Sequence, residues 1–390
     1  PGIYLDTPVT VLDYASLYPS SMISENLSHD SIVTDEEFLG DNGARKLEEL
    51  GYGYVDVTHD TYKWVDSRIR SKGKVKTGQK TCRFVQPPDD DKSIIPKILK
   101  KLLKARKDTR KKIKTADTEF MKGVLDGLQL AYKLTANSLY GQIGAMTSPI
   151  NMKDIAASTT AVGRSLLNLA KTKTIERFPD AEIVYGDTDS IFINYNPMDD
   201  DGNELEGREA LKKSIDMGVE TEKYIKQFLK APHNLEYEKT FMPFCLLSKK
   251  RYVGMLYEHD INKCKRKSMG IVLKRRDNAP VVKDIYGGII DIIMKEQNIE
   301  KAVLFTKKFL QDIIDEKIPL EKLIITKSLR EFYKNPESIA HKVLADRMGK
   351  RDPGNKPSTG SRIPFVYIKT KKKVKLQGDK IEHPSYIKEN

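Results

Sequence analysis

Aspartates in two separate segments have the residue type and the surroundings of a metal site. Asp13 ends a strand-like alternation over residues 9–12, and small residues with Pro19 after it indicate the start of a helix. Asp187 and Asp189 stand between two apolar runs, as in a β-hairpin whose tight turn carries acids. Two carboxylates at one hairpin tip repel each other unless a cation lies between them, and hard oxygen ligands favour Mg²⁺ or Mn²⁺. If the two segments form neighbouring strands, the three acids converge into a site for two ions.

A second group of candidate residues is cationic and lies in helical segments. Lys133, Asn137 and Tyr140 are spaced i, i+4 and i+7, so they share one face of a helix. Arg106 and Arg110 are four residues apart on the preceding helical segment. A face with a cation, an amide and a ring can meet phosphate, hydrogen-bond acceptors and the plane of a base.

A third group consists of three consecutive cations before an aromatic-rich strand. Lys249, Lys250 and Arg251 precede Tyr252, and Tyr257 follows in the same stretch. Such a segment suits contacts to nucleic-acid phosphates.

Each signal has a plainer interpretation when it is taken alone. Asp13 would cap a helix, and Asp187 and Asp189 would be ordinary turn residues. The cations would be solvated charges on a helix surface or at a strand end. Their conjunction in one chain favours the chemical interpretation.

Two helices must position the cationic group. Residues 97–114 contain ten basic residues and one acid, with apolar residues at helical spacing, so we predict an amphipathic helix beginning near Pro96. A second helix is predicted over residues 119–140, ended by Gly141 and Gly144. The short polar link between them predicts an antiparallel helical hairpin.

The rest of the chain predicts mixed structure. Residues 51–91 indicate short strands and loops, with a turn signal at residues 72–74. A helix is predicted over residues 154–177 and a strand pair over residues 182–194. Residues 263–353 are basic and mostly helical by pattern.

Composition limits the class of protein. The chain has 390 residues, with 68 Lys and Arg against 55 Asp and Glu and a net charge of +13, which suits a polyanionic partner. No apolar stretch approaches the roughly 18 residues of a transmembrane helix, and the start of the chain lacks the pattern of a signal peptide. Three widely separated cysteines and six histidines that never pair at ligand spacing favour neither a disulfide framework nor a Cys/His zinc site.

Taken together, these segments resemble family B DNA polymerases, most closely the delta-type replicative enzymes of eukaryotes and of the large DNA viruses that infect them. The resemblance covers nearly the whole chain, and its motifs occur in the order of the family. They are residues 13–20 (Asp-Tyr-Ala-Ser-Leu-Tyr-Pro-Ser), 133–141 (Lys, three residues, Asn-Ser-x-Tyr-Gly), 185–190 (Tyr-Gly-Asp-Thr-Asp-Ser), 249–252, and the thumb-like stretches 274–280 and 350–354.

The resemblance implies a DNA-templated polymerase that adds deoxynucleotides to a primer 3′-hydroxyl and releases pyrophosphate, with two Mg²⁺ ions for which Mn²⁺ could substitute. Asp13 and Asp189 match metal ligands, together with the carbonyl of Tyr14, and Asp187 matches a supporting catalytic carboxylate. Tyr18 matches the ring that excludes a ribose 2′-hydroxyl.

Binding residues follow from the same resemblance. Those matched to the incoming triphosphate are Ser16, Leu17, Tyr18, Arg106, Arg110, Lys133 and Asn137. At the position of Arg110, delta-type chains often have Lys. Those matched to primer-template DNA are Tyr140, Gly141, Thr188, Lys249, Lys250, Arg251, Tyr252, Arg275 and Arg276.

The implied fold is α+β, a right-hand polymerase core with an antiparallel-sheet palm, helical-hairpin fingers and a mainly helical thumb. We place the palm at residues 1–92, with an inserted loop and strand region, and at 146–262, the fingers at 93–145 and the thumb at 263–390. Since the chain starts at Pro1, we expect a core fragment with an incomplete thumb and with the exonuclease domain outside it. We also expect an intracellular replicative role, in the nucleus or at a viral replication site, and a sliding clamp bound through regions outside this chain.

Two other functions stay open on the residues alone. Clustered carboxylates on a basic scaffold also serve metal-dependent nucleases. The net charge by itself fits a DNA-binding fragment without catalytic activity.

Overall fold

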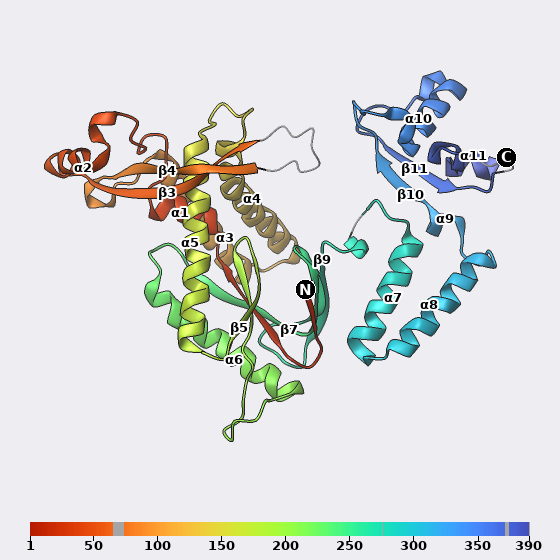
Figure 1. Ribbon diagram of the computed structural model, residues 1–390, viewed down its shortest axis with the longest axis horizontal. Coiled ribbons are helices and arrows are strands. Elements are labelled where there is room, and N and C mark those ends of the chain that lie inside the picture. Colours follow the sequence, from red (N-terminus) through yellow and green to blue (C-terminus); the bar gives the residue numbers. More distant parts are fainter. Residues whose placement is uncertain (65–73, 275, 371–373, 390) are drawn as a thin grey trace. The chain divides into compact units, whose positions relative to one another are not determined.

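The computed structural model describes residues 1–64, 74–274, 276–370 and 374–389 (Figure 1). The chain divides into two compact units. The larger unit contains Thr7–Thr240 and Glu258–Ile261, and the smaller unit contains Pro1–Asp6, Phe241–Tyr257 and Asn262–Asn390.

An antiparallel sheet forms the base of the larger unit. Its strands are β5 (Glu182–Asp187), β6 (Ser190–Asn194), β2 (Val9–Tyr14) and the first half of β7 (Leu235–Ser248), in the spatial order β5-β6-β2-β7. The strand pair predicted over residues 182–194 is therefore confirmed as β5 and β6.

Helices cover one face of this sheet. Thr10, Leu12 and Tyr14 point to the same face, because side chains alternate along a strand. Thr10 donates to the Ser214 carbonyl of α6 (Gly207–Ile225), and Tyr14 donates to the Leu166 carbonyl of α5 (Lys153–Arg177). Asp13 therefore projects from the opposite face of β2. The predicted helix over residues 154–177 is confirmed as α5.

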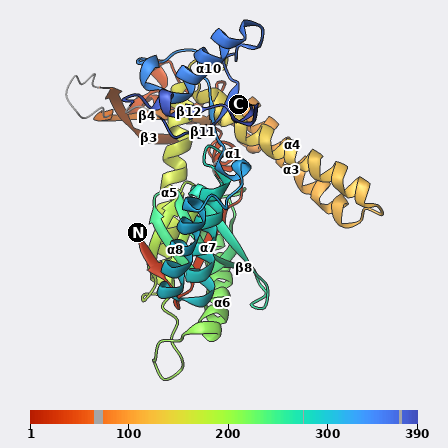
Figure 2. The same cartoon turned by 90° about the vertical axis from the view of Figure 1, so that its right-hand side faces the viewer.

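Two long helices form an antiparallel hairpin in the larger unit. They are α3 (Ile94–Lys114) and α4 (Glu119–Gly144), which lie side by side in both views (Figures 1 and 2). The α3 helix begins two residues before the predicted start, because Pro96 fits the first turn, where no backbone N–H needs an intrahelical acceptor. The α4 helix continues through Gly141, the predicted end, and stops at Gly144.

The base of this hairpin packs on the short helix α1 (Leu17–Ser24). A buried apolar cluster joins α1, α3, α4 and α5. Its members include Met22, Phe84, Leu99, Ala136, Ile143 and Ile155.

Residues 53–64 and 74–86 form one long strand pair, so the prediction of short strands was wrong. Strands β3 (Gly53–Trp64) and β4 (Lys74–Gln86) pair antiparallel, with a register shift between Thr61 and Tyr62. Cross-strand pairs such as the Thr58 and Thr81 hydroxyls, 2.8 Å apart, extend the ladder where the sequence lacks apolar alternation. Residues 72 and 73 of the predicted turn lie outside the described residues. The helix α2 (Gly40–Glu49) precedes this strand pair.

The smaller unit contains more strand than the sequence predicted. Its first part joins the second half of β7 with β1 (Gly2–Tyr4), β8 (Arg251–Tyr257) and β9 (Cys264–Met269). Helices α7 (Pro280–Glu296), α8 (Ile299–Ile314), α9 (Leu320–Leu323) and α10 (Ala340–Arg351) follow, as the pattern indicated. A further sheet of β10 (Ile325–Ser328), β11 (Arg362–Tyr367) and β12 (Ile381–Glu382) precedes α11 (Pro384–Glu389).

The strands β9 and β10 correct the mostly helical prediction for residues 263–353. The β9 sequence is largely charged and exposed, so it carries no apolar alternation, and its pairing with β8 depends on backbone hydrogen bonds.

Short 3₁₀ helices complete the described chain. They are Glu36–Phe38, Pro88–Asp90, Lys226–Phe228, Val272–Lys274, Pro336–Ser338, Pro353–Asn355 and Gln377–Lys380. In the described parts of the chain, every helix is too short or too polar to cross a membrane.

A substitution of Phe84 tests whether the buried apolar cluster stabilises the packing of the β3–β4 strand pair against the helices. Because this side chain is fully buried, Phe84→Ala should lower the free energy of unfolding by about 3–5 kcal/mol. Urea titration followed by circular dichroism measures the change. Val75→Ala on the exposed part of β4 is the matched control and should have little effect. Equal losses in both variants would contradict a core role for Phe84.

Candidate active site

Strand register brings Asp13 and Asp189 together from distant segments. Asp13 is the register partner of Ser190 in the β2–β6 pair. The Tyr14 N–H donates to the Asp189 carbonyl at 2.8 Å. This backbone hydrogen bond fixes the position of Asp13 along its strand relative to Asp189. The condition for bringing these acids together, that their segments form neighbouring strands, is therefore met by β2 and β6.

The turn between β5 and β6 contains Asp189, the second aspartate of the candidate metal site. Asp187 pairs with Ser190 across a two-residue loop, and the Asp189 N–H donates to the Asp187 carbonyl at 2.6 Å. Thr188 in this loop has φ 56°, a left-handed conformation that is uncommon outside glycine. Ser16, just before α1, has φ 55°. Such strained residues cluster at functional sites, and here both lie beside the candidate carboxylates.

A cavity of about 400 Å³ opens at this point of the larger unit. It brings together all the residues that the sequence matched to metal and to triphosphate, with Thr188. Those residues are Asp13, Tyr14, Ser16, Leu17, Tyr18, Arg106, Arg110, Lys133, Asn137 and Asp189. Asp187 is not among the lining residues in the described part of the chain, and its carboxylate accepts a hydrogen bond from Thr188 at 3.2 Å.

The carboxylate side of the cavity is electrostatically strained. Burial, and after it the charges of Asp189 and Glu238, together raise the pKa of Asp13 to about 7, against the opposing effect of Lys239 and Lys133. A divalent cation between Asp13 and Asp189 would relieve this repulsion. The oxygen donors available there fit Mg²⁺ or Mn²⁺ better than a softer metal.

The helical hairpin supplies the cationic side of the cavity. Arg106 and Arg110 come from α3, and Lys133 comes from α4. Burial and the nearby Arg110 lower the pKa of the Arg106 guanidinium, against the opposing effect of Glu236. Its Nε donates to the Gln129 side-chain oxygen at 3.3 Å, which orients the guanidinium. Cations held this close together favour an anionic ligand.

Helix α1 contributes its N-terminus and a tyrosine ring. In its first turn, the N–H groups of Leu17 and Tyr18 have no intrahelical acceptor, as at any helix start, so they suit phosphate oxygens. The Tyr18 ring lies against the Tyr140 ring of α4, with centroids 4.4 Å apart. Gly163 of α5 lies close to both side chains of this turn, since a Cβ there would be 3.3 Å from Leu17 and 3.4 Å from the Tyr18 ring.

Tyr14 takes part in the site through its backbone alone. Its ring is 1% exposed, and its hydroxyl is bound to the Leu166 carbonyl on the helix-covered face of the sheet. Burial raises the pKa of the Tyr14 hydroxyl. The carbonyl is therefore the group that Tyr14 can offer a metal, as the resemblance implied.

Sequence reasoning missed three charged residues of β7. Glu236 lines the cavity, and Glu238 and Lys239 act on the pKa of Asp13. Glu236 accepts a hydrogen bond from Asn234 at 2.7 Å, and Lys239 donates to Glu238 at 2.6 Å. The alternation of apolar and acidic residues at 235–238 is the signal that could have placed both glutamates on one face of a strand.

A family model described as DNA polymerase family B matches residues 1–390. This chain belongs to DNA polymerase family B. It is 51% identical to a DNA polymerase of Pyramimonas orientalis virus, over 100% of this chain and 35% of that protein. It is 32% identical to the DNA polymerase delta catalytic subunit of Candida albicans, over 99% of this chain and 34% of that protein.

The chain thus spans about a third of the length of these family B relatives. A solved structure has the same fold: the family B DNA polymerase from the hyperthermophilic archaeon Pyrobaculum calidifontis. It is 23% identical, with a TM-score of 0.59, over 99% of this chain and 42% of that one. The predicted family, with viral and delta-type relatives, is confirmed, as is a mixed helix and sheet fold.

Candidate DNA-binding residues of this family B chain lie in both units. Gly141 is exposed on α4 of the larger unit. Lys249, Lys250 and Arg251, at the β7–β8 turn of the smaller unit, are exposed. Arg276 is also exposed there, and Arg275 lies outside the described residues.

Tyr252 differs from these exposed residues. Its ring is 4% exposed and packs against Phe241 and Phe244, with centroids 5.9 Å and 5.6 Å away. The structure therefore gives this ring a packing role that supports the β7–β8 turn.

The raised pKa of Asp13 predicts a pH-dependent stability in the metal-free protein. A folded-state pKa of about 7, against an ordinary 3.8, means that stability falls as the pH rises through this window. Asp13→Asn cannot ionise, so it should be more stable than the wild type by a few kcal/mol at about pH 8, and by little at about pH 4. Urea unfolding in EDTA measures this. The exposed Asp200→Asn is the control, and an equal gain at both pH values would contradict the burial of the Asp13 charge.

Proposed function

We propose that this chain is the nucleotidyl-transfer core of a DNA-templated DNA polymerase that acts in genome replication. It adds deoxynucleotides to a primer 3′-hydroxyl and releases pyrophosphate. The observation that carries the proposal is that one cavity of this family B chain has Asp13 and Asp189 on one side and Arg106, Arg110 and Lys133 on the other. The two sides suit a cation and a polyphosphate, the two charged components of this reaction.

The acidic side is the metal site of the proposal. Asp13, Asp189 and the Tyr14 carbonyl would hold Mg²⁺ or Mn²⁺, and Asp187 supports the turn that carries Asp189. Two such ions supply acidification of the attacking hydroxyl and charge neutralisation at the transferred phosphoryl group. Glu236 and Glu238 add negative charge on the same side and so strengthen the preference for a cation.

The cationic side binds the triphosphate. Arg106, Arg110 and Lys133 neutralise its negative charge, and the first-turn N–H groups of Leu17 and Tyr18 meet its oxygens. Asn137 lies one turn after Lys133 on the same face of α4, and Ser16 precedes α1 at the cavity wall. Because Arg106 and Arg110 offer planar forks, they can grip two phosphate oxygens each.

The aromatic pair sets the choice of sugar. Tyr18 lines the cavity, and its ring packs at a tilt of 37° against the Tyr140 ring, which supports it in the proposed position beside the nucleotide sugar. A ribose 2′-hydroxyl would then collide with a ring that cannot move away.

The remaining assignments extend the proposal to DNA and to domains. Primer-template contacts are assigned to Tyr140, Gly141, Thr188, Lys249, Lys250, Arg251, Arg275 and Arg276, with Tyr252 supporting the turn. The palm comprises residues 1–92 and 146–262, the fingers 93–145 and the thumb 263–390. The site of action is the intracellular place of DNA replication, and a sliding clamp would bind outside this chain.

Primer extension tests the proposal directly. Asp13→Ala and Asp189→Ala should each reduce Mg²⁺-dependent extension of a labelled primer by about a hundredfold or more, since several kcal/mol of charge stabilisation are lost. Asp200→Ala, in an exposed loop, should extend as the wild type does.

Two outcomes would count against this function. Extension that survives either active-site substitution would contradict the metal assignment. Metal-dependent shortening of the DNA without nucleotides would favour a nuclease, and salt-sensitive binding without any metal or nucleotide dependence would favour a binding fragment.

Sugar selection gives a second test. Tyr18→Ala should raise ribonucleotide incorporation relative to deoxynucleotide incorporation by about tenfold or more, because a steric exclusion of about 1.4 kcal/mol already accounts for one decade. Single-nucleotide insertion kinetics with matched dNTP and rNTP measure the ratio. The exposed Tyr52→Ala is the control. An unchanged ratio would place the Tyr18 ring away from the sugar.

A further inference from the structure

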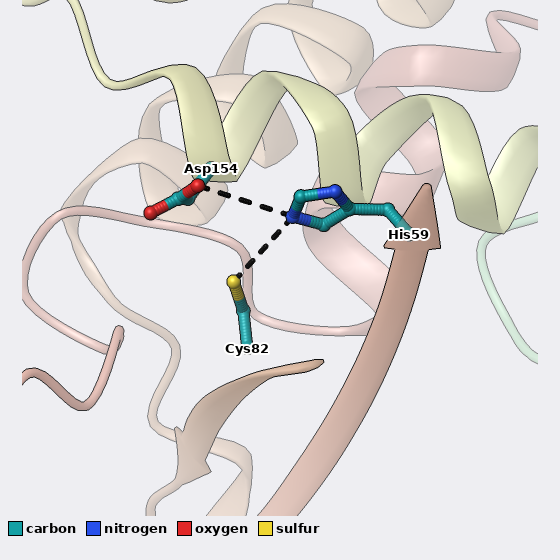
Figure 3. Close-up of side chains that lie close together, drawn as sticks. All are labelled: His59, Cys82 and Asp154. Carbon is teal, nitrogen blue, oxygen red and sulfur yellow. Dashed lines mark hydrogen bonds and ion pairs between the residues drawn. The ribbon is translucent and has the colours of Figure 1, made fainter. Parts of the chain in front are cut away.

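A second cluster of ligand-type side chains lies away from the Asp13 cavity, in the larger unit. It joins His59 of β3, Cys82 of β4 and Asp154 in the first turn of α5 (Figure 3). One atom from each residue, Nε2, Sγ and a carboxylate oxygen, lies within 4.8 Å of the other two. The sequence favoured no Cys/His zinc site because these residues are far apart along the chain, and strand pairing and helix packing bring them together.

The distances fit a tetrahedral metal. The Cys82 Sγ lies 3.6 Å from the His59 Nε2, and the Asp154 Oδ1 lies 3.9 Å from the same nitrogen. Around Zn²⁺, with bonds of about 2.0–2.3 Å, such ligand atoms would lie about 3.3–3.6 Å apart. The sulfur–nitrogen pair already meets this spacing, and the carboxylate–nitrogen distance exceeds it by about half an ångström.

Polar contacts with neighbouring residues orient the side chains of His59 and Asp154. The His59 Nδ1 lies 3.4 Å from the Asp60 carbonyl, which can accept only from an N–H on Nδ1. That tautomer leaves the Nε2 lone pair facing the sulfur and the carboxylate, as a metal ligand requires. Lys80 binds the Asp154 Oδ2 at 2.7 Å and so orients Oδ1 toward His59. Figure 3 shows both contacts of the ring converging on this one nitrogen. A catalytic triad would instead need the carboxylate on the other ring nitrogen.

A buried hydroxyl adds a second, independent observation. The Ser158 side chain, one helical turn after Asp154, is 0% exposed, and its Oγ has no hydrogen-bond partner among the described residues. Burial and the charge of Asp154 raise the pKa of the Cys82 thiol, and the nearby Ser158 hydroxyl opposes this only weakly. The Cys82 thiol is at most a weak partner for this buried hydroxyl, so a ligand at this point would satisfy it better.

We propose that His59, Cys82 and Asp154 bind one Zn²⁺ ion, with Ser158 or a water as the fourth ligand. Thiolate, imidazole and carboxylate together favour Zn²⁺ over Mg²⁺, which prefers oxygen ligands alone. Binding replaces the Cys82 S–H bond by a sulfur–metal bond and releases that proton to solvent. The ion would fasten the β3–β4 strand pair to α5, and so stabilise the larger unit rather than take part in nucleotide chemistry.

Cobalt substitution tests the site without reference to polymerase activity. Co²⁺ is added to the metal-free protein in excess Mg²⁺, which occupies oxygen-only sites. A thiolate-to-cobalt absorption band should appear and saturate at about one equivalent. Cys82→Ser should abolish the band, whereas the matched variants Cys245→Ser, buried, and Cys264→Ser, exposed, should keep it. Zn²⁺ should displace the cobalt and raise the melting temperature of the wild type.

A further variant keeps the test decisive if Cys82→Ser does not fold. The Asp154 side chain is 33% exposed, so Asp154→Asn should fold and should weaken cobalt binding by about tenfold or more. A missing band in the wild type, a band that survives in Cys82→Ser, or an unchanged affinity in Asp154→Asn would each overturn the proposal.

Discussion

The pairing of β2 with β6 is the constraint on which the candidate active site depends. It places Asp13 opposite Ser190, and the Tyr14 N–H bond to the Asp189 carbonyl fixes the two carboxylates side by side. A slip of one residue would turn Asp13 toward the helix-covered face of the sheet. That slip is opposed by Tyr14, whose ring is buried against α5. The packing of the helix-covered face of β2 therefore determines that Asp13 projects from the opposite face, toward the candidate site.

Charge separation across the cavity explains why two such different elements meet there. The sheet supplies carboxylates, and burial with mutual repulsion raises the pKa of Asp13. The α3–α4 hairpin supplies guanidinium and ammonium groups, and burial with mutual repulsion lowers the pKa of Arg106. On each side the like charges repel one another, and a ligand of opposite charge would relieve that repulsion. The apolar cluster around Leu99 and Ile143 stabilises the helices against the unfavourable energy of these like charges.

The same larger unit contains a second cluster of quite different character. His59, Cys82 and Asp154 combine soft and hard donors in a mostly buried setting, whereas the Asp13 cavity offers oxygen donors and opens to solvent. Donor type therefore separates the two sites, with Mg²⁺ or Mn²⁺ suited to the first and Zn²⁺ to the second. The proposed zinc ion would act on stability, since it joins a strand pair to α5.

Local patterns in the sequence determined the helical hairpin, because turn residues and helical spacing are properties of neighbours along the chain. The resemblance of its ordered motifs indicated the family and the candidate site residues. Only the tertiary structure decided which distant residues share a site. It added Glu236 from β7 to the cavity, buried the Tyr252 ring, and paired β3 with β4 where the sequence showed no clear alternation. It also brought His59 to Cys82, because strand register and packing, and not spacing along the chain, fix the distances between such side chains.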